Sequence, residues 1–496
     1  MAEQVDRRRQ EPLDEDHLCA SEQSQEPPRS SKLFGVIPLD WRYDLASLRP
    51  IRWLLKQRWF PMILILFNMF VFMIILASGI LGGFSAGNYS FSIMIVWILW
   101  WVLLMMFLVP VLSRSWCLMC PLPSLGEWLQ RLRIFGVNNT LHGLNLKWPK
   151  RLSNMWVMNF LFLGTTFFSG FFTVRPLITF YLLGGIIVIG IVLSLVFEKR
   201  SFCLYVCPVS GFQGLYSNTA MLEIRAKDPA VCEKHRKKTC VTGNKNGYGC
   251  PWLLEPHSFK RNTYCGMCLE CFKTCPFDNM AMNVRPPGTD LLVNRSRGLD
   301  EAWKAFIMMG IAVMFYVAMM GRWAWLKDWV RGETLSGWLS FVGLHTAFNL
   351  LIIPGVFLVF VRLSKLVSGA RDVSLKTVFV NLSYCLIPMG LAAWIAFSFG
   401  FLLPNGSYVL HVISDPFAWG WDLFGTANVP WTPVLTGWLV PLQFATLIVG
   451  FLISADYGFK LCRQSYSDER AAKRGFVPLL VFLTGVTVVF GWLYGG

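Results

Sequence analysis

Long apolar runs constrain this chain more than any other feature of its sequence. Each run is long enough to cross the roughly 30 Å hydrocarbon core of a bilayer as a helix. A lone segment in lipid satisfies its backbone hydrogen bonds only as a helix, and the flanking Trp, Tyr, Lys and Arg residues are typical of membrane interfaces rather than of a large soluble core. We therefore predict an α-helical integral membrane protein with about nine transmembrane helices, at residues 60–84, 90–112, 155–173, 177–197, 302–321, 338–361, 377–403, 436–456 and 475–494.

The distribution of Lys and Arg predicts the orientation of these helices. With a cytoplasmic N-terminus, the cytoplasmic segments contain 40 of the 45 Lys and Arg residues, and the outer loops contain four. Cytoplasmic loops of membrane proteins are enriched in basic residues in this way. The net charge of +16 is then mostly a consequence of topology, and no nucleic-acid partner is needed to explain it.

Polar and apolar segments divide the chain into four parts. Residues 1–35 are polar and poor in large apolar side chains, which predicts a disordered cytoplasmic tail. Residues 36–200 would form a four-helix membrane module, and residues 201–300 a small cytoplasmic ferredoxin-like iron–sulfur domain between helices 4 and 5. Residues 301–496 would form a five-helix membrane module with a long outer loop at 404–435.

Fourteen cysteines do not form a disulfide framework here, because eleven of them lie in three places on the predicted cytoplasmic side, where disulfides are rare. Metal and redox roles are favoured in such a compartment. The remaining three, Cys19, Cys385 and Cys462, are expected to be inert.

The most specific motif is "CGMCLECFKTCP" at residues 265–276, with the spacing C-x2-C-x2-C-x3-C-P. In bacterial ferredoxins three thiolates of this motif bind one [4Fe–4S] cluster and the fourth ligates a second cluster. A structural zinc site would usually need paired C-x2-C knuckles. We predict that Cys265, Cys268 and Cys271 bind one cluster and that Cys275 reaches another.

A less regular group of cysteines precedes this motif. Cys232, Cys240 and Cys250 are separated by stretched spacers, and a proline follows Cys250. By the crossover of two-cluster ferredoxins, Cys250 would complete the first cluster, while Cys232, Cys240 and Cys275 would hold a second that lacks one thiolate. His235 is a candidate for the extra ligand. A water-capped or three-iron cluster, or a half that binds nothing, are the alternatives.

Two similar motifs, "RSWCLMCP" and "RSFCLYVCP", follow the second and fourth apolar runs. The matching flanks indicate that the helical hairpins 60–112 and 155–197 are a duplicated unit. If the hairpins pack as repeats, four thiols meet at the membrane edge. Four soft ligands suit an iron–sulfur cluster, Cu(I) or Zn, and two redox-active dithiols are the alternative. The cysteines concerned are Cys117, Cys120, Cys203 and Cys207.

With these motifs, residues 60–290 resemble the NapH/NosR-type membrane polyferredoxins, which are integral membrane proteins with Cys-Pro motifs at helix ends. The resemblance implies electron transfer between the quinone pool or cytoplasmic donors and a partner, or maturation of a metal centre. It also implies that the membrane-edge cysteines and the ferredoxin motif bind clusters. The two-residue spacer between Cys117 and Cys120 departs from the family, which commonly has three residues there.

The second half of the chain contains no cysteine cluster. His345 lies in a predicted membrane helix, where a haem ligand, a quinone-site donor and a helix-packing hydrogen bond are the alternatives. The outer loop 404–435 has no Lys or Arg and is rich in aromatic residues, so it is either a docking surface or lid for an extracytoplasmic partner or a self-packed loop.

The function that these motifs predict is membrane-bound electron transfer. Two to three [4Fe–4S] clusters would pass electrons between cytoplasmic donors or the quinone pool and a respiratory membrane or periplasmic partner. We find no catalytic acid, base or nucleophile, so an electron-transfer subunit of a larger complex is favoured over a stand-alone enzyme. The expected location is the bacterial plasma (inner) membrane. The alternative is a copper reductase or assembly factor for a respiratory enzyme, with copper at the membrane-edge cysteines.

Overall fold

The computed structural model describes residues 31–82, 87–293, 297–320, 323–370, 372–466 and 468–495. Most of the predicted tail, with Cys19, lies outside these ranges. The last residues of that tail are ordered, because β1 (Lys32–Leu33) pairs antiparallel with β2 (Ile37–Pro38).

The described chain is mostly helical, and eight of its helical segments are long and apolar enough to cross a membrane. This confirms the multi-pass helical class. Their bounds are α2 (Trp59–Leu81), the α3-to-α5 segment (Phe91–Leu112), α10 (Pro176–Val196), α15 with η12 (Leu299–Met320), α17 to α18 (Leu335–Ser368), α19 to α20 (Leu375–Asn405), η14 with α22 (Thr436–Ser465) and α23 (Glu469–Gly495).

The predicted helix at 155–173 differs from the other eight. It is divided into α8 (Trp156–Thr166) and α9 (Ser169–Phe172), so neither piece has the length of a membrane span. The first piece lies against α15, where Asn159 Nδ2 of α8 donates to Asp300 O at 2.8 Å. The second piece lies against α16 (Ala324–Arg331), because a Cβ on Gly170 of α9 would lie 2.3 Å from Val330 O.

Several of the apolar segments contain wide helical turns. The 91–112 segment is built from α3 (Phe91–Ile93), η5 (Met94–Trp100), α4 (Trp101–Leu103), η6 (Leu104–Leu108) and α5 (Val109–Leu112), of which η5 and η6 are π-helical. The segments that end in η12 (Tyr316–Met320) and contain η13 (Phe348–Ile352) have the same feature. Such turns are common at functional sites.

The part of the chain that contains Cys232 to Cys275, here called the thiol-bearing part, is built around a three-stranded antiparallel sheet of order β3–β5–β4. The strands are β3 (Tyr43–Asp44), β4 (Leu222–Ala226) and β5 (Met280–Val284), with Leu222 opposite Val284. The segment before the first membrane helix therefore joins this part, through β3 and through α1 (Arg49–Lys56), where Lys56 pairs with Asp278 at 2.8 Å. Short helices fill the rest: α12 (Pro229–Lys234), α13 (Thr239–Thr242), η10 (Asn262–Tyr264), α14 (Glu270–Thr274) and η11 (Thr289–Leu292).

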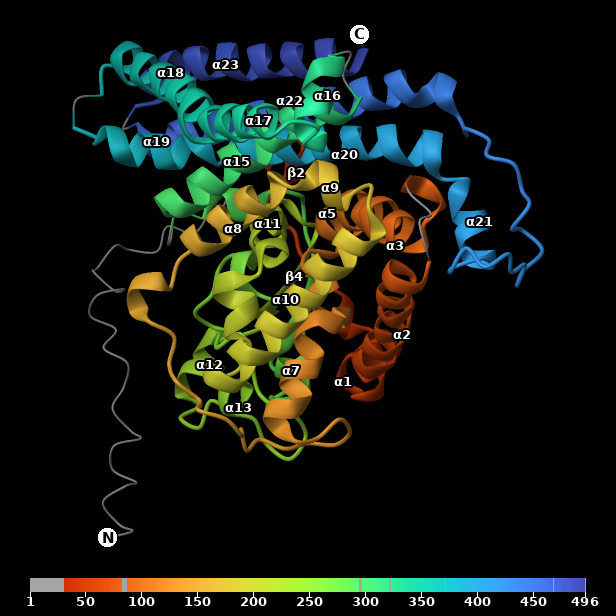
Figure 1. Cartoon of the computed structure of the whole chain (residues 1–496). Coiled ribbons are helices and arrows are strands. Elements are labelled where there is room, and N and C mark those ends of the chain that lie inside the picture. Colours follow the sequence, from red (N-terminus) through yellow and green to blue (C-terminus); the bar gives the residue numbers. More distant parts are fainter. Residues whose placement is uncertain are drawn as a thin grey trace.

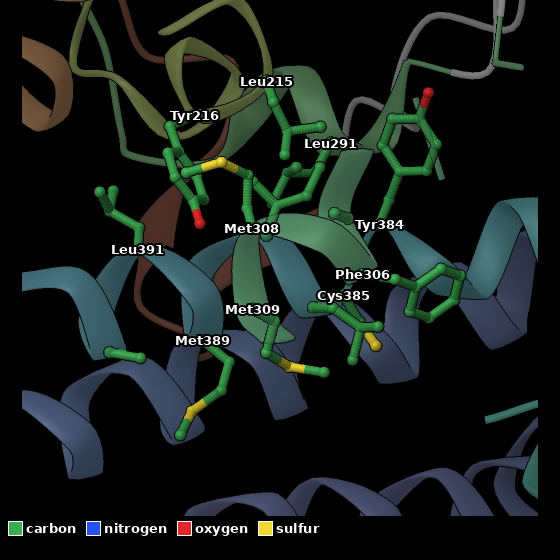
Figure 2. Close-up of a cluster of buried hydrophobic side chains, with 14 of the residues drawn as sticks. Leu215, Tyr216, Leu291, Phe306, Met308, Met309, Tyr384, Cys385, Met389 and Leu391 are labelled. Atoms are coloured by element: carbon green, nitrogen blue, oxygen red, sulfur yellow. The ribbon is translucent and has the colours of Figure 1, made fainter. Parts of the chain in front are cut away.

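The C-terminal helices form a layer against which the N-terminal half packs (Figure 1). The short helices α12 and α13, which carry Cys232 and Cys240, lie on the far side of the molecule from this layer. Figure 2 shows part of the contact: Tyr216 and Leu291 lie near Met308 of α15, and Leu391 of α20 lies on the side of Tyr216, whereas Met389 points to the other side of α20. All five side chains belong to one buried cluster. The cysteine-poor half thus supports the thiol-bearing half through an apolar core.

Two features of the C-terminal half, His345 and the loop 404–435, are singled out by the sequence. His345 Nε2 lies 2.9 Å from Thr166 Oγ1, which is a packing contact between helices. The outer loop begins with α21 (Tyr408–Ser414) and is held by its own hydrogen bonds, since Asp415 accepts from the amides of Trp419 (2.9 Å) and Gly420 (2.8 Å). The loop therefore makes hydrogen bonds within itself, and its function as a docking surface or lid stays a prediction.

Candidate functional site

The two Cys-Pro motifs have the same local structure. Cys117 lies in α6 (Trp116–Met119) and Cys203 in η8 (Phe202–Val206), and the second cysteine of each motif follows in extended backbone, with ψ of 125° at Cys120 and 115° at Cys207. The proline then begins a new helix, α7 (Pro121–Arg131) or α11 (Pro208–Tyr216). Proline suits the first helical position and excludes helical backbone in the residue before it. The repeated proline thus turns the chain and places the second cysteine of each motif directly before a helix start.

The arginine of each motif reaches across to the other motif. Arg200 donates to Cys117 O at 3.2 Å and forms an ion pair with Glu127 at 2.7 Å. Arg114 donates to Ser210 Oγ, near the start of α11. This reciprocal arrangement is what a packed duplicated unit would produce, and it brings the four cysteines together.

The four cysteines that meet in this way, Cys117, Cys120, Cys203 and Cys207, are here called the membrane-edge thiol group. Burial raises the pKa of Cys207 to about 11, and Cys117 adds to this effect. Burial also raises the pKa of Cys203 well above its usual value, with further contributions from Cys207, Cys117 and Cys120. The mutual effects indicate four neighbouring thiols in an apolar environment.

A second set, Cys250, Cys265, Cys268 and Cys271, is here called the middle thiol group. A hydrogen bond with Cys250 is the largest of the effects that raise the pKa of Cys268. Burial raises the pKa of Cys271, and the neighbouring Cys268 and Cys265 raise it further. Cys250 therefore joins the first three cysteines of the ferredoxin motif, as the crossover rule predicts.

Gly266, inside the ferredoxin motif, makes room for a buried indole. A Cβ at this position would lie 2.1 Å from the Trp252 ring, so only glycine fits without displacing that ring. Trp252 is 2% exposed and in turn contacts the Arg114 guanidinium, 4.5 Å from the ring centroid. The loop of the middle group is therefore packed directly against the membrane-edge motif.

The third set, Cys232, Cys240 and Cys275, is here called the distal thiol group. Burial raises the pKa of Cys240 to about 11, and Cys232 adds to the shift. Asn279 connects the other two thiols, because its amide nitrogen Nδ2 lies 3.3 Å from Cys232 Sγ and its backbone N lies 3.4 Å from Cys275 Sγ. The three cysteines predicted to share the incomplete cluster therefore do lie together.

A small cavity of about 20 Å³ lies among these three thiols, and two histidines, His235 and His257, line it. The His235 ring packs edge-on against Phe277, with the centroids 5.1 Å apart. His257 Nδ1 lies 3.5 Å from Glu255 Oε2. Sequence reasoning missed His257, because it belongs to no spaced motif and only the fold returns residue 257 to this cavity.

The three groups follow one another through space. Burial lowers the pKa of Arg200, but Glu127 and the cysteines Cys203 and Cys268 raise it above its usual value. Since Cys203 belongs to the membrane-edge group and Cys268 to the middle group, Arg200 lies between these two groups. Cys240 contributes to the raised pKa of Cys271, so the distal and middle groups are neighbours as well. Lys199 Nζ donates to Val241 O at 2.9 Å and to Cys250 O at 3.2 Å at this second junction.

No three His, Cys, Asp or Glu side chains in the described ranges converge closely enough to hold a single metal ion. A mononuclear zinc site places sulfurs about 2.3 Å from one centre. In a cubane each cysteine binds a different iron, so the thiols stand further apart. The cysteines lie in groups of four, four and three, and the three of them that are buried, Cys117, Cys203 and Cys207, belong to the membrane-edge group.

No family model, curated protein or solved structure matches this chain. The apolar helices fit an α-helical multi-pass membrane protein, whose cysteine-rich part lies on the far side of the molecule from the C-terminal layer (Figure 1).

Proposed function

We propose that this protein is an electron-transfer protein of the bacterial plasma membrane that carries up to three [4Fe–4S] clusters. The membrane-edge and middle groups would each bind one cluster with four cysteines. The distal group would bind a third with three cysteines and His235. Electrons would pass between cytoplasmic donors or the quinone pool and a respiratory membrane or periplasmic partner.

The observation that carries this proposal is the series formed by the three thiol groups. Arg200 stands between the first and second groups, and Cys271 and Cys240 connect the second and third. A structural metal site needs no neighbour, whereas a relay needs each centre beside the next. The series also begins beside membrane helices and ends at the side remote from the C-terminal layer (Figure 1).

Iron–sulfur clusters, when bound, supply one-electron transfer at potentials set by charge, hydrogen bonds and exposure. The chain supplies the surroundings. The membrane-edge cysteines Cys117, Cys203 and Cys207 are buried, which excludes water. Arg114 and Arg200 place two positive charges beside sulfurs that become anionic ligands. Neutral thiols must lose their protons on binding iron, and these guanidinium groups stabilise the resulting charge.

We also propose nine crossings, with α8 and α9 as a divided ninth. Their 156–172 segment would span about 25 Å at 1.5 Å per residue, and it lies against α15 at one end and α16 at the other. Without this crossing, the two Cys-Pro motifs would emerge on opposite sides of the membrane. The excess of Lys and Arg on the thiol-bearing side favours a cytoplasmic location for the clusters.

The test is metal analysis of the full chain purified without oxygen. We expect about 8–12 iron atoms and matching sulfide per chain, with EPR signals of reduced [4Fe–4S] clusters. Four iron atoms or fewer would refute the relay. Stoichiometric copper bound at Cys117, Cys120, Cys203 and Cys207 would instead support the copper reductase or assembly alternative, since Cu(I) prefers soft thiolates.

A further inference from the structure

One fully buried lysine has no carboxylate partner in the described part of the chain. Lys304 of α15 is 0% exposed. Its Nζ donates to Met158 O at 3.3 Å and lies 5.2 Å from the centroid of the Phe162 ring. Among the described residues these are its only hydrogen-bond and ring partners, and neither carries a charge. An ammonium that is removed from water is unfavourable unless an anion compensates it.

The two carboxylates on the same helix are held elsewhere. Glu301, which lies one turn before Lys304, accepts from both terminal nitrogens of Arg261, at 2.7 and 2.9 Å. The Asp300 carboxylate accepts from the backbone N of Met155 at 2.8 Å. The helix that carries Lys304 therefore does not supply its anion.

The side chain of Lys304 reaches the helix that follows the membrane-edge thiol group. A Cβ on Gly211 of α11 would lie 3.2 Å from Lys304 Nζ, so the ammonium uses space that this glycine leaves free. Gly211 lies in the first turn of α11, where its backbone N donates to Cys207 O at 3.2 Å. Among the ionisable side chains of the described ranges, only Cys207 is close enough for its charge to affect that of Lys304.

The charge of Cys207 depends on whether its sulfur is a ligand. Burial raises the pKa of Cys207 to about 11, although hydrogen bonds from the backbone of Ser210 and Val209 oppose this effect. The free thiol is therefore neutral at pH 7 and leaves Lys304 without an anion. A cysteine that binds iron is a thiolate. The anion that fits Lys304 is thus the ligated sulfur with its cluster.

We propose that Lys304 is the positive charge that compensates the iron–sulfur centre of the membrane-edge group and raises its reduction potential. The inference rests on the proposed function, because the anion is the bound cluster. Lys304 contacts no reacting atom and acts through the charge that it places beside Cys207, so it is a positioning residue.

The charge balance of the reduction shows what Lys304 contributes. An electron that arrives from the neighbouring middle centre oxidises that centre and adds one negative charge at the membrane-edge group. Lys304 keeps its proton throughout, so no proton has to move with the electron. Because the site is buried, solvent and salt screen this interaction little. The raised potential favours electron transfer from the middle group toward the membrane.

The first test is a redox titration followed by EPR on the full chain purified without oxygen. Lys304→Met keeps most of the side-chain volume and removes the charge. At a fixed potential, the ratio of reduced to oxidised membrane-edge centre should fall roughly 10-fold, because a weakly screened unit charge is lost. The signal of this centre is identified by its absence from Cys203→Ser/Cys207→Ser. The middle and distal centres should keep their potentials.

The matched control is Lys460→Met. Lys460 also lies in a membrane helix, α22, but its ammonium forms an ion pair with Asp456. This variant should leave all the potentials unchanged. An unchanged membrane-edge potential in Lys304→Met would overturn the inference. An equal shift of all the centres would overturn it as well, since it would indicate general damage.

The second test compares the thermal stability of the chain with and without the membrane-edge sulfurs. Lys304→Met should lower the Tm of the otherwise unchanged chain, because the buried cluster loses its compensating charge. In the Cys203→Ser/Cys207→Ser background it should raise the Tm, since an apolar side chain replaces an ammonium without an anion. An effect on the Tm that is equal in both backgrounds, or less favourable in the second, would mean that Lys304 does not compensate these sulfurs.

Iron analysis of the same samples keeps the two proposals apart. Full iron with an unchanged membrane-edge potential in Lys304→Met refutes this inference alone. Four iron atoms or fewer, with no membrane-edge signal, refutes the relay. The comparison of Tm values then decides by itself whether Lys304 compensates the charge of the sulfurs.

Discussion

The membrane-edge and distal thiol groups are built in different ways from the same residue type. The membrane-edge group comes from a duplicated motif, and each repeat supplies two cysteines and an arginine that contacts the other repeat. The distal group comes from a stretched, unrepeated segment and has three cysteines with a histidine-lined cavity. If the proposed clusters are bound, duplication would supply a complete ligand set by symmetry, whereas the distal group would need a ligand of another type.

Removing either half of the membrane-edge group should have the largest effect. We expect Cys117→Ser/Cys120→Ser and Cys203→Ser/Cys207→Ser to lose the same centre, about four iron atoms per chain, because two thiolates leave half of a cubane unligated. EPR of the two double variants should match, with the middle and distal signals retained. Iron content and EPR measure this directly.

The control for these variants is Cys385→Ser/Cys462→Ser, which changes two buried cysteines that belong to none of the three groups. Its iron content should equal that of the unchanged chain. Wild-type metal and spectrum in either membrane-edge variant would mean that the two repeats do not share a centre.

Acid should loosen the distal group before the membrane-edge group. Glu223 of β4 forms ion pairs with Arg285 and Arg42, both at 2.7 Å, and with Arg225 at 3.3 Å. Burial alone would raise the pKa of Glu223, but the three guanidinium groups lower it to about 2, from an ordinary 4.5. The lowered pKa contributes roughly 3 kcal/mol of stability above pH 4.5, which is lost as the pH falls toward 2.

Glu223→Gln should therefore lower the Tm at pH 7 and have little effect near pH 2, where the native carboxyl is largely protonated as well. Release of iron during acid titration should begin with the distal EPR signal, since Cys232 follows β4 and Cys275 precedes β5. Glu469→Gln, an exposed helix-start carboxylate, is the control. Equal acid sensitivity of all the clusters would contradict the comparison.

The identity of the non-cysteine ligand separates the two groups further. His235→Ala should convert the distal centre to a three-iron form, seen as a change of EPR signal with the loss of about one iron atom. His257→Ala should leave the signal unchanged, because His257 lies against Glu255. The opposite result would make His257 the ligand, and no change in either variant would indicate a water cap.

Hydrogen bonds to sulfur should have the smallest effect. Asn279→Leu removes the contact from Nδ2 to Cys232 Sγ at 3.3 Å but retains the backbone contact to Cys275. Loss of a donor to a ligand sulfur destabilises the reduced cluster, so the potential of the distal centre should fall while the other centres keep theirs. Redox titration followed by EPR measures this shift. Asn246→Leu, an exposed loop change, should shift no potential.

The apolar runs predicted the helical membrane class, because a span needs only length and hydropathy, which are local properties. The same reasoning failed to anticipate the division of residues 155–173, since the break between Thr166 and Ser169 adjoins packing contacts with partners as distant as Val330. Similarly, β3 joins the sheet of a segment more than 200 residues later, which no local pattern of two residues can reveal.

For the candidate site, the sequence by itself determined the cysteines and their grouping, because ferredoxin spacing and a repeated motif encode geometry over a few residues. Only the tertiary structure decided how the groups follow one another and what lies beside them. The crossed contacts of Arg114 and Arg200, the return of His257 to the distal thiols, and the approach of Lys304 to Gly211 all join residues far apart in the chain. Such contacts arise from the packing of whole helices, and the identity of any single residue does not specify them.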